Sequence, residues 1–257
     1  MTYNGINIRT VLKGTVNPVM ILWFIAAFTA YFIKGLCGFA NTLVFTTILS
    51  FGAANASISP VDVLLGYPAN LILTWKNRRS LDPKVFLPLA ILVLAGSIPG
   101  ALMLKNVDAR SIKLVFGVVV IALGMEMLAR ECGKKRVRSS KLVLVIIGVI
   151  AGMLCGLFGV GALLAAYVSR VTETDSSFKA NISAVFIVDN TFRIILYKTL
   201  GLLTPGTVKS VLLLIPFALL GLFTGMKCCG HMNENNVRKI TTVLLILSGI
   251  SLVLKNL

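Results

Sequence analysis

Lys34, Asp189 and Arg193 are ionisable side chains inside long apolar stretches of the chain, where a buried charge is costly and usually functional. Asp189 and Arg193 are four residues apart, so on a helix they share one face and can pair. Arginine suits a small oxyanion because its planar donor fork matches two ligand oxygens and keeps its charge when buried. We therefore predict an anion site in which Arg193 contacts the ligand, Lys34 adds positive potential, and Asp189 holds Arg193 in place or carries a proton.

Each of these charges also has a purely structural interpretation. Asp189 and Arg193 would form a self-neutralising pair, and the long side chain of Lys34 would extend to the membrane surface. Amide side chains near the charges offer further hydrogen-bond donors to an anion. The amides that belong to the candidate site are Asn41, Asn70 and Asn190.

Two glycine clusters interrupt the apolar stretches, in AYFIKGLCGFANTLV (residues 30–44) and AGMLCGLFGVGALLA (residues 151–165). An interrupted helix exposes N–H and C=O groups, which membranes tolerate only where protein buries them or a cavity receives them. The half-helix after each break would direct its positive N-terminus at an anion. Close helix packing is the alternative, because small residues spaced by four serve it well. The glycines assigned to the candidate site are Gly35, Gly38, Gly156, Gly159 and Gly161.

The two clusters are copies of one pattern, because Gly35 recurs as Gly156 and Gly38 as Gly159 at a spacing of 121 residues. The register persists to the ends of both halves with a small insertion. Transporters commonly arise by duplication, with the substrate bound where interrupted segments of the two repeats meet. The sequence therefore predicts a duplicated membrane protein.

Composition supports a membrane setting. The chain is 57% hydrophobic with 13% charged residues, whereas soluble domains carry about 25% charged residues, and its mean hydropathy is +0.92. We predict an all-α polytopic membrane protein with two homologous halves of four hydrophobic segments each, the first of each half broken or re-entrant at its glycine cluster. The eight segments cover approximately residues 19–50, 59–75, 85–104, 109–129, 141–169, 178–200, 206–229 and 234–255.

Three of the segments begin with a capping side chain before a proline, in Ser59-Pro60, Asp82-Pro83 and Thr204-Pro205. The organisation that follows has four parts. They are an N-terminal tail (1–18), membrane repeat 1 (19–129), a basic inter-repeat loop (130–140) and membrane repeat 2 (141–257).

The net charge of +16 indicates orientation in a lipid bilayer and not a nucleic-acid partner. The basic inter-repeat loop is typical of a cytoplasmic anchor against anionic lipid. The N-terminus is not expected to be a cleaved signal peptide, because the repeat makes the first apolar stretch part of the fold. We expect a multi-pass protein of the cell (plasma) membrane.

Two topologies fit this pattern. If segments 1 and 5 cross the membrane as broken helices, the repeats are parallel and both termini lie inside. If these segments are hairpins that turn at the glycines, the repeats are inverted and both termini lie outside. Lys and Arg counts over the loops do not separate the two. We favour hairpins, because a glycine break at mid-depth suits a re-entrant tip and inverted repeats give alternating access directly.

The sequence resembles the sulfite exporter TauE/SafE family of anion transporters over roughly residues 19–257. The first half resembles it in KGLCGFANTLVFTTIL, with Asn41 and Thr46 where the family pattern more often has glycine and proline. The second half is closer, in AGMLCGLFGVGALL and FKANISAVFIVDNTFRIILYKTLGLLTPGT, which include Lys179, Asn190 and Arg193. The resemblance implies a secondary transporter for a small sulfur-containing or organic anion, such as sulfite, a sulfonate or a sulfoacetate-like compound.

A membrane thiol–disulfide electron carrier is the alternative function. Cys37 and Cys155 each lie in a glycine-turn segment, one in each half. They are not repeat equivalents, neither has a Cys-x-x-Cys context, and buried cysteines usually act as small hydrophobes. With His231 as the single histidine and no nucleophile motif beside Asp189, the sequence predicts no enzyme, no metal site and no cofactor.

Overall fold

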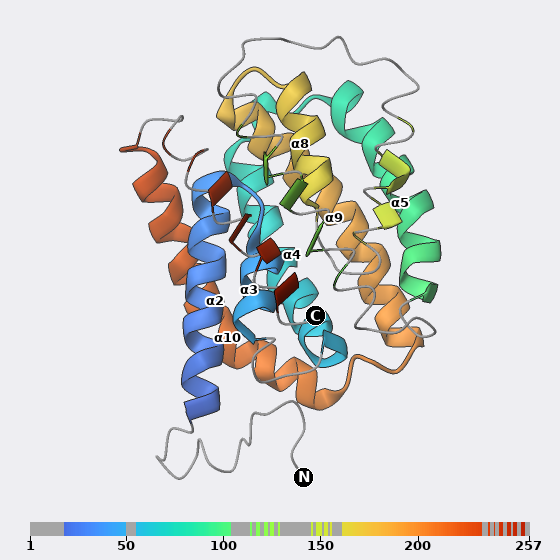
Figure 1. Cartoon of the computed structure of the whole chain (residues 1–257), viewed down its shortest axis with the longest axis vertical. Coiled ribbons are helices and arrows are strands. Elements are labelled where there is room, and N and C mark those ends of the chain that lie inside the picture. Colours follow the sequence, from blue (N-terminus) through green and yellow to red (C-terminus); the bar gives the residue numbers. More distant parts are fainter. Residues whose placement is uncertain are drawn as a thin grey trace.

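The computed structural model describes residues 18–49, 55–103 and 161–232 continuously, with scattered positions between 114 and 155 and between 236 and 254. The continuous part is built of helices, and four of them are long and apolar enough to cross a membrane: α2, α5, α9 and α10. The elements are α2 (Pro18–Cys37), α3 (Asn41–Leu49), α4 (Asn55–Lys76), the 3-10 turn η1 (Arg78–Ser80), α5 (Pro83–Met103), α8 (Ala162–Val171), α9 (Asp175–Thr199) and α10 (Pro205–Cys229) (Figure 1).

The all-helical fold is thus confirmed for the described residues, and four of the helices have the length and composition of membrane spans. The prediction of eight segments and of an internal repeat stays a prediction, since residues 109–129, 234–255 and the first part of 141–169 lie outside the continuously described chain. The basic loop 130–140 and the tail 1–17 lie outside it as well.

The first apolar stretch is a hairpin with a long arm and a short one. α2 has 20 residues, about 30 Å of helix, and α3 has 9 residues, about 13 Å. Trp23, near the start of α2, packs edge-on against Phe45 at 5.8 Å between ring centroids, while Lys34, near its end, contacts Asn41 at the start of α3. Trp23 precedes Lys34 along α2, whereas its partner Phe45 follows Asn41 along α3. The two helices are therefore antiparallel, and α3 folds back against α2.

The turn of this hairpin uses left-handed backbone. Gly38 has φ +84° and Ala40 has φ +70°, a conformation that only glycine adopts without strain. The turn lies beside Lys179, in the second turn of α9. It therefore lies near the N-terminal end of α9. The expected position of the break at mid-depth in a membrane stays a prediction.

Two of the three proposed helix starts are confirmed. Asp82 accepts a hydrogen bond from the backbone N–H of Lys84 at 2.9 Å, and Thr204 caps α10 in a reciprocal capping box with Thr207. The third was wrong, because α4 begins at Asn55 and contains Pro60.

Ser59 is therefore not a cap, and its hydroxyl is used elsewhere. It contacts Tyr197 at 2.9 Å and accepts a hydrogen bond from Arg193 at 3.0 Å. An interior proline such as Pro60 is tolerated in a membrane helix because neighbouring helices supply the missing polar partners.

Helices α2 and α10 pack side by side along glycines (Figure 1). A methyl group on Gly35 would overlap the backbone of α10 at Leu222, and one on Gly225 would overlap the carbonyl group of Phe32. Gly221 meets Phe28 in the same way. Because both residue numbers increase together along the contact, the two helices run parallel. The packing interpretation of Gly35 is the one that this geometry supports.

Helices α4 and α9 cross the middle of the bundle in opposite directions. Ser59 contacts Tyr197, and further along α4 Tyr67 accepts a hydrogen bond from Thr191 at 3.4 Å. These helices are the second segments of the two proposed halves. If the halves are inverted, equivalent helices are antiparallel, as α4 and α9 are. If the halves were parallel, the two helices would be parallel as well.

Candidate functional site

A small cavity lies where the α2–α3 hairpin meets α4, α9 and the start of α8. Its volume is about 20 Å³, which is room for about one water molecule. Four of the predicted site residues with polar side chains line it together, although they are far apart in the sequence. The lining is Lys34, Phe39, Ala40, Asn41, Thr42, Leu43, Asp62, Val63, Asn70, Gly161, Phe186 and Asn190.

The N-termini of two short helices open onto this cavity. Helix α3 begins at Asn41, and its first internal hydrogen bond joins the Val44 N–H to Ala40 at 3.1 Å. Helix α8 has Gly161 as its N-cap residue, and its first internal bond joins the Ala165 N–H to Gly161 at 2.8 Å. The N–H groups before these donors have no acceptor within their own helices. Both helix ends therefore direct partial positive charge at the cavity.

Lys34 is buried here and does not extend to a membrane surface, since only 1% of its side chain is exposed. Its ammonium group donates a hydrogen bond to the Asn41 side-chain oxygen at 2.9 Å. It also lies 5.4 Å from the centroid of the Phe186 ring, close enough for a cation–π interaction. Phe186 in turn packs on Gly161, where any side chain would overlap the ring. The second glycine cluster thus supports Lys34 from across the cavity.

Asp62 is the carboxylate of the cavity, and the sequence analysis missed it. It is 3% exposed and accepts hydrogen bonds from the Asn41 amide at 3.1 Å, from the Thr42 hydroxyl and from Tyr31 at 3.4 Å. With a helix start assumed at Pro60, Asp62 would be an ordinary acidic residue of a first turn. The earlier start at Asn55 puts Asp62 two turns inside the helix. An acidic residue in a segment of membrane length was the signal that could have found it.

Asn70 and Asn190 complete the polar lining. Asn70 is 1% exposed, and its side-chain oxygen has no hydrogen-bond partner within the described part of the chain. Asn190 is 8% exposed. Because an amide presents either its oxygen or its NH₂ group after a half-turn, both residues can offer donors to a ligand.

Arg193 and Asp189 are buried beside this cavity but do not line it. One terminal nitrogen of Arg193 donates to the Tyr197 hydroxyl at 2.7 Å and to Ser59 at 3.0 Å, while its Nε atom has no partner among the described residues. Asp189 accepts a hydrogen bond from Ser97 of α5 at 2.5 Å. In this conformation Arg193 joins α9 to α4, and Asp189 joins α9 to α5.

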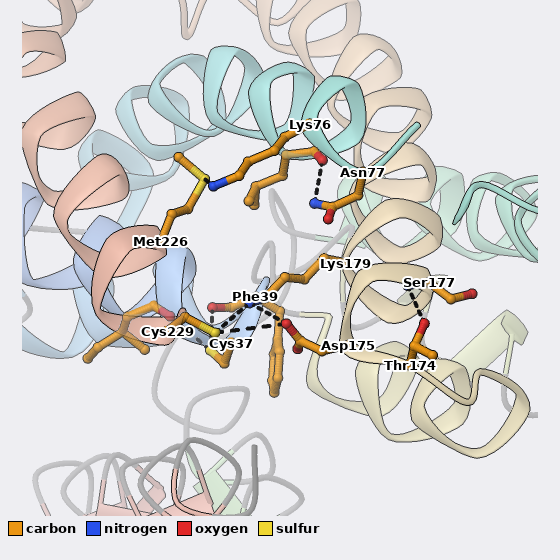
Figure 2. A network of polar contacts seen from close by, with 12 residues as sticks. Cys37, Phe39, Lys76, Asn77, Thr174, Asp175, Ser177, Lys179, Met226 and Cys229 are labelled. Atoms are coloured by element: carbon orange, nitrogen blue, oxygen red, sulfur yellow. Dashed lines mark hydrogen bonds and ion pairs between the residues drawn. The ribbon is translucent and has the colours of Figure 1, made fainter. Parts of the chain in front are cut away.

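Gly38 belongs to the turn and is covered by Lys179. A methyl group at Gly38 would lie 2.8 Å from Cγ of Lys179. The Lys179 ammonium forms an ion pair with Asp175 at 2.7 Å and contacts the Cys229 sulfur at 3.1 Å, and Figure 2 shows this group around Cys37 and Phe39. Gly38 therefore allows the hairpin turn to pack under a lysine. Of the remaining predicted site residues, Gly35 packs on α10, and Gly156 and Gly159 lie outside the described residues.

The family model of the sulfite exporter TauE/SafE proteins matches residues 23–252. No curated protein and no solved structure matches the chain. The family match covers nearly the whole chain, including α3, α2 from residue 23 onward and every residue that lines the cavity. The chain therefore belongs to the sulfite exporter TauE/SafE family of membrane transporters.

Proposed function

We propose that this protein is a secondary transporter that moves a small sulfur-containing or organic anion, such as sulfite, a sulfonate or a sulfoacetate-like compound, across the cell membrane by alternating access. The observation that carries the proposal is the meeting of Lys34 with the N-termini of α3 and α8 at one cavity. A buried cation and two positive helix ends favour a negative ligand. Membership of the sulfite exporter TauE/SafE family supports the same conclusion, because sulfite is a small anion.

In the proposed complex the Lys34 ammonium forms the principal contact with the anion. The free N–H groups of the first turn of α3, which begins at Asn41, supply directed hydrogen bonds, as does the α8 end at Gly161. Asn70 and Asn190 contribute amide donors from α4 and α9. Because a binding site inside a membrane excludes water, these interactions are stronger there than at a surface.

The size of the cavity supports alternating access. Room for about one water is less than a sulfonate group requires, so an anion enters only if the surrounding helices move apart. The opposite directions of α4 and α9 support inverted repeats, in which each half can open the site to a different side. Arg193, held between these two helices by Ser59 and Tyr197, lies where such movement would expose its unpartnered Nε atom.

The test is flux into proteoliposomes that contain the purified full-length chain, with sulfite, thiosulfate, methanesulfonate and short carboxylates offered separately. We expect saturable flux of at least one anion and its loss in Lys34→Gln. Lys76→Gln is the matched control, because Lys76 is an exposed lysine at the end of α4 and should leave flux unchanged. Absence of saturable flux for every anion, or wild-type flux in folded Lys34→Gln, would refute the proposed function.

A further inference from the structure

The buried charges around the cavity balance one another. Lys34 and Asp62 line the cavity, and Arg193 and Asp189 lie next to it on α9. All four are at most 3% exposed. Two cations and two carboxylates give no net charge when all four are ionised. A charge inside a membrane protein that is not balanced is costly, so this arrangement suits an empty site.

An anion that enters the cavity disturbs this balance. It adds one negative charge close to the Asp62 carboxylate, which already faces the Lys34 ammonium across the Asn41 amide. Two carboxylate-like groups in one poorly solvated site repel each other strongly, and one of them then binds a proton readily. The positive helix ends offset only part of this repulsion, because a negative charge at a helix N-terminus is stabilised by only about 0.3–2 kcal/mol.

We propose that Asp62 takes up one proton together with each transported monoanion, so that the protein is an anion–proton symporter. This inference rests on the proposed function. The proton comes from water on the side where the anion enters, bonds to a carboxylate oxygen of Asp62 and leaves to water on the other side, and no other bond changes. The anion is then the one negative charge that faces Lys34 in the cavity, because Asp62, on the other side of the Asn41 amide, is neutral.

The hydrogen bonds of Asp62 suit both of its protonation states. Thr42 donates its hydroxyl proton to the ionised carboxylate. When Asp62 is protonated, the same hydroxyl oxygen can accept the new O–H, because a hydroxyl group is both donor and acceptor. Asp189 lacks this position, since it does not line the cavity. Of the two carboxylates that are buried among the described residues, the geometry therefore selects Asp62.

The groups that face Asp62 come from three neighbouring helices. Tyr31 and Lys34 approach from α2, and α9 contributes the positive charge of Arg193. Helix α3 contributes Asn41 and Thr42, whose side chains are neither acids nor bases at physiological pH. Asp62 is the carboxylate among these groups that lines the cavity, so it is the group that an entering anion affects most directly.

The test uses the full-length wild-type chain in proteoliposomes with methanesulfonate, whose charge does not change between about pH 5.5 and 9. An inward proton gradient should drive uphill accumulation, and a trapped pH dye should report one proton per anion. Because binding of one proton is linked to binding of the anion, KM should fall about tenfold for each unit by which the pH is lowered, as long as Asp62 is ionised in the empty protein.

Asp62→Asn should retain the hydrogen-bonding shape without the titration. We expect a KM that does not depend on pH, no proton movement and no uphill accumulation. Asp62→Glu should restore proton movement in part. Asp189→Asn is the matched control, a buried carboxylate on a neighbouring helix, and it should keep the pH dependence of KM.

The outcomes separate this inference from the proposed function. No saturable flux of any of the offered anions in the wild-type protein contradicts both, and if another anion is transported in place of methanesulfonate, the dye and KM measurements are made with that anion. Saturable flux without proton movement, or proton coupling that survives in Asp62→Asn or disappears in Asp189→Asn, overturns the symport assignment alone. If Asp62→Asn does not fold, the dye and the KM profile of the wild-type protein still decide whether protons move.

Discussion

The Lys34 ammonium and the Asp62 carboxylate are joined through one amide, that of Asn41. Asn41 accepts a hydrogen bond from Lys34 at 2.9 Å and donates one to Asp62 at 3.1 Å. The two charges therefore fix the orientation of the amide, and the amide fixes the spacing of the charges. The first residue of α3 in this way links α2 to α4 at the edge of the cavity.

Removing one of these two charges should destabilise the protein more than removing both. Lys34→Met leaves the Asp62 carboxylate buried without its cation, which costs about 3–5 kcal/mol in comparable pairs. The double variant Lys34→Met/Asp62→Asn removes both charges and should recover at least half of that loss. Thermal unfolding in detergent at one pH measures both, and additive losses in the double variant would show that the charges are not coupled.

The hairpin turn should respond in opposite ways to two substitutions. Gly38→Ala places a side chain at φ +84° and against Lys179, and it should cost about 1–3 kcal/mol. Ala40→Gly removes the strain of an alanine at φ +70° and should be stabilising by up to about 1 kcal/mol. Unfolding midpoints of the two variants provide the comparison. A Gly38→Ala protein as stable as the wild type would be inconsistent with the left-handed turn.

Arg193 should affect helix packing more than anion affinity. Arg193→Lys keeps the charge, but one ammonium group cannot reproduce the donor geometry toward Tyr197 and Ser59. We expect a lower unfolding midpoint and a KM within about threefold of the wild type, since hydrogen bonds to a charged group contribute about 1.5–3 kcal/mol each to stability.

Tyr197→Phe removes one of the two partners of the Arg193 guanidinium without touching its charge, and it should reproduce part of the loss of stability. A large rise in KM with unchanged stability in Arg193→Lys would instead assign Arg193 to direct contact with the anion.

The directions of α4 and α9 can be checked by labelling single cysteines in a protein whose five cysteines are replaced by alanine or serine. Arg79→Cys follows the end of α4, and Thr199→Cys stands at the end of α9. Both positions are exposed. Antiparallel helices predict that a membrane-impermeant thiol reagent reaches these two positions from opposite sides. Labelling of both from one side would contradict the inverted arrangement.

The sequence predicted much of the site because its polar residues stood out in an apolar chain. Lys34, Asn41, Asn70 and Asn190 were selected for this reason, and the fold brings them to one cavity. The glycine pattern likewise marked the break at Gly38. Such signals depend only on residue type and spacing, which a sequence contains in full.

The role of each residue in the folded protein was harder to predict than its presence in the site. Asp62 escaped notice because the position of a helix start decides whether an acid lies in a first turn or deep in a membrane segment. Gly35 and Gly38 look alike in the sequence, yet one packs on α10 and the other forms a turn. Arg193 contacts Ser59, which is 134 residues away, and local spacing carries no information about such a partner.

The glycine contact between α2 and α10 constrains the mechanics of this molecule. Where Gly35 faces Gly225 the two backbones touch directly, and separating them would leave a gap that no nearby side chain can fill. We therefore expect the two helices to move together during any motion of the bundle. The contact between α4 and α9 differs, because its hydroxyl pairs at Ser59–Tyr197 and Tyr67–Thr191 can exchange partners with water at little net cost. We therefore expect the contact between α4 and α9 to be the one that changes when the helices move apart.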